Sequence, residues 1–151
     1  MTVPQLRRAA RVLLLDGHDR VLLFQGRDPV HADRGQWWFT PGGGLDEGET
    51  PAQGAARELR EETGLRAGAI TALGQLDVAP GMSSQRGWVF LATELSEGDH
   101  DREPEEQDMR SEWFTETQVE RMIRDREITD AQSIAAWALM LLAEREPPVN
   151  L

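Results

Sequence analysis

The residues best suited to chemistry in this sequence are Glu58, Glu61 and Glu62, which fall within one expected helix. Their spacing of three and four residues places the carboxylates together on one helix face. Like charges this close repel one another and destabilise an isolated helix. A hard divalent cation bound through oxygen ligands would remove the repulsion, and Mg²⁺ or Mn²⁺ suits such ligands best. A solvated face balanced by Arg57 and Arg60 is the alternative that helix geometry leaves open.

The composition narrows the classes of protein to which the chain can belong. Its 151 residues predict a single domain over 1–151 that can bury a core. The net charge of −11 opposes binding to nucleic acid or to a membrane surface, so neither partner is expected. The absence of cysteine excludes disulfides and thiolate metal sites. With no signal peptide apparent and no apolar run near the ~18 residues of a membrane span, we expect a cytoplasmic protein.

The acidic residues need a helix to hold them, and the sequence predicts one from Thr50 to Thr63. Thr50 can cap its start, and Gln53 completes a capping box with it. Gly64 supplies the stop at the carboxyl end. The preceding segment, Pro41 to Gly44, is expected to be a loop in which glycine gives the backbone freedom.

Around this helix, the remaining pattern predicts several strands and two further helices. The first two strands, 9–15 and 21–24, are joined by turn residues at 16–19 and are expected to form a hairpin. Further strands are expected over 37–39, 70–78, 87–95 and 109–115, and helices from about 115 and from 129 to 144. This order predicts an α/β (α+β) fold in which a mixed β-sheet is sandwiched between α-helices.

From Gly43 to Leu65 the chain reads GGLDEGETPAQGAARELREETGL. A glycine is followed after five residues by Glu49, and after seven more by the run RELREETGL. At every defined position this matches the signature of the Nudix hydrolase family, which the chain resembles. The resemblance implies a Nudix fold and a metal-dependent hydrolase that cleaves a diphosphate linked to a nucleoside, a small-molecule substrate.

The resemblance also implies roles for individual residues of this chain. The metal ligands would be three carboxylates and one backbone carbonyl: Glu58, Glu61, Glu62 and Gly42. Glu61 and Glu62 would also act in catalysis with the metal, Mg²⁺ or Mn²⁺. Glu49 and Arg57 would form a supporting pair that orients the ligands. Gly43 would let the substrate phosphates approach the backbone closely.

Three segments of the second half resemble the branch of the family that cleaves ADP-ribose and nucleoside-diphosphate sugars: APGMSS (79–84), EPEEQDM (103–109) and REITDAQSIAAWALMLL (126–142). They imply an ADP-sugar such as ADP-ribose as substrate, cleaved to AMP and a sugar phosphate. In that branch an acidic loop supplies the base that assists the water, which here would be Glu105 or Glu106. Arg27 follows the second expected strand and is positioned to reach a substrate phosphate.

Two alternatives remain beside this interpretation. The first keeps the chemistry but takes a nucleoside triphosphate, an oxidised nucleotide or a dinucleoside polyphosphate as substrate. The second is a nucleotide-sensing Nudix module without catalysis, although all three glutamates of the signature are present. The apolar final helix and the habit of the family also suggest a homodimer.

Overall fold

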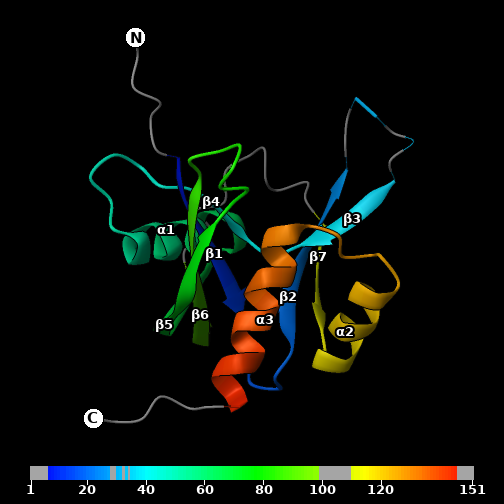
Figure 1. Cartoon of the computed structure of the whole chain (residues 1–151). Helices are drawn as coiled ribbons and strands as arrows, with labels where there is room; N and C mark the ends of the chain where they lie inside the picture. Colours follow the sequence, from blue (N-terminus) through cyan, green and yellow to red (C-terminus); the bar gives the residue numbers. More distant parts are fainter. Residues whose placement is uncertain (1–6, 28–29, 32, 34, 99–109, 146–151) are drawn as a thin grey trace.

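The computed structural model describes residues 7–27, 30–31, 33, 35–98 and 110–145 (Figure 1). Its elements follow one another as β1 (Arg8–Leu14), β2 (Val21–Arg27), β3 (Gln36–Phe39), β4 (Gly42–Gly44), α1 (Pro51–Thr63), β5 (Leu65–Asp77), β6 (Arg86–Glu97), β7 (Arg110–Phe114), α2 (Glu116–Arg124) and α3 (Ala131–Arg145). No helix among the described residues is long and apolar enough to span a membrane.

A four-stranded mixed sheet with the order β4-β1-β6-β5 forms the central layer. Strand β1 runs parallel to β6 and antiparallel to β4, while β5 and β6 are antiparallel. Side chains on its two faces enter two separate cores because neighbouring residues of a strand point to opposite faces. Val12 of β1 packs with Leu59 of α1, whereas Leu13 packs with Trp137 of α3. The sheet therefore lies between α1 and α3, which confirms the predicted sandwich (Figure 1).

The structure has a second sheet of three antiparallel strands, β3-β2-β7, whereas the sequence pattern predicted a single mixed sheet. The predicted hairpin between the first two strands is wrong, since β1 and β2 belong to different sheets and share one isolated bridge, Leu15 with Val21. Both edges of β1 are already occupied by β4 and β6, so β2 has no edge to join. The turn between them is closed by Asp16, whose carboxylate accepts hydrogen bonds from the His18 and Arg20 amides.

The glycine segment that precedes α1 is also more regular than expected. Residues 42–44, predicted as loop, form the short strand β4, which pairs with Ala9–Arg11 of β1. Strand β4 lies at the edge of the sheet, and its pairing with β1 places the glycines beside the helix that carries the acidic residues. The predicted helix is confirmed as α1, and it leads directly into β5.

Candidate active site

Helix α1 is fixed at both ends by its own sequence, which sets the direction in which its glutamates point. The Thr50 hydroxyl accepts a hydrogen bond from the Gln53 amide at 3.2 Å, and the Gln53 side chain accepts one from the Thr50 amide at 3.0 Å. Gly64 ends the helix in the left-handed conformation, with φ of 73°. Such a capping box and glycine stop satisfy backbone groups that the helix itself leaves unpaired.

Glu49 and Arg57 form a two-point ion pair between the loop before α1 and the helix itself. Arg57 Nε lies 2.8 Å from Glu49 Oε2, and Arg57 Nη2 lies 3.0 Å from Glu49 Oε1. The hydrogen bond from Arg57 is the main reason that the pKa of Glu49 falls below its usual range. The same bond raises the pKa of Arg57, so both groups are ionised at neutral pH. A planar guanidinium held at two points has little freedom to rotate.

The remaining donors of Arg57 reach the glutamates of the helix. Nη1 donates to Glu61 Oε2 at 3.0 Å and to Glu58 Oε1 at 3.1 Å, while Nη2 also donates to the Gly44 carbonyl at 2.9 Å. Asp46 lies 3.1 Å from Arg57 Nε and is 70 % exposed. Four carboxylates therefore surround one guanidinium, and negative charge is in excess within this group.

Glu58 lies against strand β4 and is only 8 % exposed. Burial is the first cause of its raised pKa, and it outweighs the lowering influence of Arg57. A Cβ atom placed on Gly43 would come within 2.5 Å of Glu58 Oε1. Glycine at position 43 is therefore what leaves room for this carboxylate beside the strand.

Glu62 is also 8 % exposed, and it contacts the strand through a hydrogen bond. Its Oε2 accepts the Gly42 amide at 3.0 Å. Gly42 has φ of 152°, and a Cβ there would overlap the Ala10 carbonyl oxygen, so glycine is required by both conformation and space. The predicted ligand at this position is the Gly42 carbonyl, whereas the contact observed with a glutamate is made by its amide.

The donor set of Glu58, Glu61 and Glu62 suits a hard divalent cation, since all three side chains offer carboxylate oxygens. Among the described residues, no group of three metal-binding side chains is already gathered closely enough to hold an ion. Glu58 and Glu61 instead turn toward Arg57, and Glu62 contacts Gly42. The chemistry of the donor set and its place on one helix face fit such a cation, although the observed side chains do not yet surround one.

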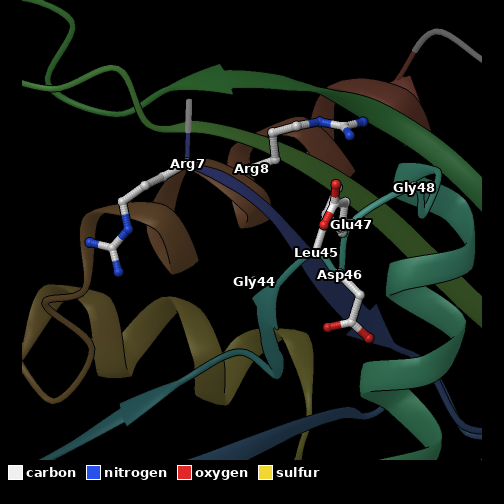
Figure 2. Close-up of a pocket in the computed structure, with 7 residues that line it drawn as sticks. All are labelled: Arg7, Arg8, Gly44, Leu45, Asp46, Glu47 and Gly48. Carbon is white, nitrogen blue, oxygen red and sulfur yellow. The ribbon is translucent and has the colours of Figure 1, made fainter. Parts of the chain in front are cut away.

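A hollow of about 420 Å³ opens beside this cluster, and Figure 2 shows its lining. Its residues come from the start of β1, the end of β4 and the loop before α1: Arg7, Arg8, Gly44, Leu45, Asp46, Glu47 and Gly48. Gly44 and Asp46 belong both to this lining and to the contacts of Arg57. Arg7 and Arg8 could not be identified from the sequence, because their place beside the loop depends on the pairing of β1 with β4.

Arg27 does not line the hollow beside the glutamates. It lines a pocket of about 370 Å³ together with Gln25, Gly26, Gln36 and Arg110. In the sheet, Arg27 pairs with Gln36, the first residue of the strand that leads toward β4. The structure thus places Arg27 in one pocket with a second arginine, Arg110, and with the side-chain amides of Gln25 and Gln36. The predicted bases Glu105 and Glu106 lie outside the described residues.

Comparison with known proteins matches residues 5–137 to the NUDIX domain. The chain is 37 % identical over 130 residues to an ADP-ribose pyrophosphatase of Mycobacterium tuberculosis, covering 84 % of this chain and 61 % of that relative. An ADP-ribose pyrophosphatase of Bacillus subtilis is 35 % identical over 109 residues, covering 70 % and 57 % respectively. The chain thus spans about three fifths of the length of these relatives.

Among solved structures, the crystal structure of an ADP compounds hydrolase matches with a TM-score of 0.80 at 23 % identity. The match covers 95 % of this chain and 76 % of that chain. It confirms the fold that the sequence signature implied.

Proposed function

The chain belongs to the Nudix family, and on that premise we propose that it is a metal-dependent pyrophosphohydrolase of nucleoside diphosphate derivatives. Two curated relatives at 37 % and 35 % identity are ADP-ribose pyrophosphatases. The proposed substrate is therefore an ADP-sugar such as ADP-ribose, which water cleaves to AMP and a sugar phosphate. This small-molecule nucleotide is the expected partner of the site.

The observation that carries the proposal is the meeting of helix α1 with strand β4. Buried carboxylates of Glu58 and Glu62 face the backbone of Gly42 and Gly43, and Arg57 holds Glu58 from the other side. Arg57 is one positive charge among four carboxylates, and the excess of negative charge is unfavourable at a buried position unless a further cation joins it. Gly44 is the glycine of this strand with open space, because a Cβ there would meet only the Arg8 carbonyl oxygen at 4.0 Å, so a diphosphate bound through that cation has room to approach the strand at Gly44.

We assign the metal site to Glu58, Glu61 and Glu62 with the Gly42 carbonyl, and the cation to Mg²⁺ or Mn²⁺. Nudix hydrolases generally need a divalent metal. When bound, the cation neutralises charge on the diphosphate and lowers the pKa of a coordinated water.

The chain's own residues have further roles in this proposal. Arg57 orients Glu58 and Glu61, and its two-point pair with Glu49 keeps the guanidinium in place. Glu61 and Glu62 take part in catalysis, and Glu105 or Glu106 accepts the proton of the attacking water. Arg27 binds a substrate phosphate, and the neighbouring Arg110 adds positive charge to the same pocket.

The test is hydrolysis of a panel of nucleotides with Mg²⁺ or Mn²⁺, with phosphate products separated by chromatography and EDTA as the control. AMP together with ribose 5-phosphate from ADP-ribose supports the proposal. Nucleoside monophosphate with inorganic pyrophosphate would instead identify a triphosphate or oxidised nucleotide as substrate. Cleavage of dinucleoside polyphosphates alone would identify that class. Metal-dependent binding without turnover of any compound would identify a nucleotide-sensing module. The single domain over 1–151, the homodimer and the cytoplasmic location stay predictions.

A further inference from the structure

Four polar or charged side chains are buried among the described residues, and two of them do not belong to the glutamate cluster of α1, which consists of Glu58, Glu61 and Glu62. Thr40, between β3 and β4, is 2 % exposed, and Ser133, in the first turn of α3, is 3 % exposed. Ser133 belongs to the segment REITDAQS, for which the reaction proposed above provides no role. A buried hydroxyl is retained at a cost unless its hydrogen bonds are made, so its partners indicate what it does.

The hydroxyl of Ser133 is fully used. Its Oγ accepts the Thr40 amide at 2.9 Å and donates to Asp130 Oδ2 at 2.6 Å, which uses the one proton of the hydroxyl. The remaining contact, 3.0 Å between Thr40 Oγ1 and Ser133 Oγ, is then donated by the threonine. Ser133 thus accepts two hydrogen bonds from Thr40 and donates one to Asp130.

Asp130 and Arg11 complete the arrangement. Asp130 caps α3, because its Oδ2 also accepts the Ser133 amide at 3.0 Å. Arg11 Nη1 donates to the Thr40 carbonyl at 2.9 Å, and Nη2 lies 4.0 Å from Asp130 Oδ2. Side chains from α3 and β1 therefore hold both backbone groups of Thr40. The next residue, Pro41, is held by its carbonyl, which accepts the Val12 amide at 2.9 Å.

Strand β4 begins directly after this held segment. Gly42 donates to Glu62, Gly43 lies against Glu58, and Gly44 accepts from Arg57. Every residue of β4 thus contacts Glu58, Glu62 or Arg57, and the clamp on Thr40 holds the chain just before the strand, in addition to the pairing of β4 with β1. We propose that Ser133 and Asp130, with Arg11, are positioning residues that set strand β4 against the glutamates of α1. The catalytic consequence of this clamp rests on the proposed function, but the clamp itself does not.

Two variant pairs test the clamp. Ser133→Ala removes the hydroxyl that receives the Thr40 amide. Ala136→Gly, three residues later on the same helix, weakens α3 through its backbone without removing a contact to Thr40. Asp130→Ala removes the acceptor for Ser133, whereas Asp130→Asn keeps an oxygen that can cap the helix and accept the hydroxyl proton.

The first readout is hydrogen exchange of the amides at positions 40 and 42–44, which needs no substrate or metal. We expect exchange at these amides to be at least about 10-fold faster in Ser133→Ala and Asp130→Ala, and close to the unmutated rate in the two partners. The second readout is kcat on ADP-ribose, expected to fall about 10-fold in the first two variants with KM changed less.

Amide hydrogen exchange at residues 40 and 42–44 that is no faster in Ser133→Ala than in Ala136→Gly would overturn the clamp. The clamp would also be overturned if amide exchange at these positions were as fast in Asp130→Asn as in Asp130→Ala. If the unmutated protein cleaves no nucleotide, the proposed function fails and the exchange experiment alone decides on the clamp. If it cleaves ADP-ribose with equal kcat and equal exchange in all four variants, the proposed function stands and the clamp is refuted.

Discussion

The side chain of Glu62 accepts a hydrogen bond from the backbone amide of Gly42 at 3.0 Å, which ties helix α1 to the strand opposite it. The glutamate is 8 % exposed, so this contact is made in a setting largely shielded from water. A carboxylate held in this way is directed at the backbone wall of the site before any ligand arrives.

Replacing Glu62 by glutamine tests its role as a ligand without removing the contact to Gly42, because the glutamine carbonyl still accepts the amide. We expect turnover of ADP-ribose to fall by about 10²-fold or more, since a metal ligand loses its charge. The melting temperature without metal should not fall, because one of several like charges has been removed. Glu97→Gln, an exposed position at the end of β6, is the matched control. Equal turnover in Glu62→Gln and Glu97→Gln would contradict the assignment.

Two neighbouring glycines of β4 provide a matched pair. Gly43→Ala places a methyl group within 2.5 Å of Glu58 Oε1, whereas Gly44→Ala meets only the Arg8 carbonyl oxygen at 4.0 Å. Neither glycine has a positive φ, so the difference lies in space alone. Because a carboxylate end can rotate away, we expect Gly43→Ala to change the melting temperature little but to lower kcat by about 10-fold or more.

The same pair also has a clear contrary outcome. Activity that falls equally in Gly44→Ala would mean that the loss comes from the backbone of β4 rather than from the displaced Glu58. Steady-state kinetics on both variants, with circular dichroism to verify the fold, distinguish these results.

The helix that carries the site could be predicted because its signals are local. Thr50, Gln53 and Gly64 lie within the helix or beside it, and the observed caps involve these same residues. Helix spacing also places Glu58, Glu61 and Glu62 on one face without any knowledge of the fold. The pairing of Glu49 with Arg57 spans eight residues and was implied by the family signature.

The contacts that cross the fold could not be predicted, since hydrophobic pattern does not specify which strands pair. Thr40 and Ser133 are separated by 93 residues, and nothing near either one indicates the other. The division of the strands between two sheets likewise depends on β1 having β4 and β6 at its edges. For the same reason, the sequence led to a predicted phosphate contact for Arg27 but not to its position beside Gln36 and Arg110.

Magnesium is expected to stabilise the unmutated protein, because a ligand that binds only the folded state raises its free energy of unfolding. At about 100 times the dissociation constant the gain is about 2.7 kcal/mol, or roughly 5–10 °C in melting temperature for a chain of this size. The measurement is a thermal shift in MgCl₂ against NaCl of equal ionic strength. This control matters because a chain with a net charge of −11 gains from any cation.

Glu62→Gln should show a much smaller magnesium shift, while Glu97→Gln should keep the full one. A shift of the same size in both variants would indicate diffuse screening of charge rather than a site on α1.

The acid pair Glu116 and Glu144 gives a prediction for stability that is independent of the active site. Burial first, and then a hydrogen bond and like charge from Glu144, raise the pKa of Glu116 above its usual value of 4.5. The folded protein therefore binds a proton at Glu116 more readily than the unfolded chain does. By linkage, its stability declines as the pH rises from the unfolded pKa through the raised folded pKa, and the penalty persists at neutral pH.

Glu144→Gln removes the like charge and also a negative charge from the last turn of α3, where the helix dipole disfavours it. We expect the melting temperature at pH 7 to rise by about 1–3 °C, and the gain to be smaller near pH 3 because the carboxyl group of Glu116, whose pKa is raised, is then protonated. In a Glu116→Gln background the gain should be smaller, since only the dipole contribution is left. Thermal denaturation of the four proteins at both pH values measures each quantity. An equal gain at pH 3 and pH 7 would show that repulsion between the two carboxylates is not its source.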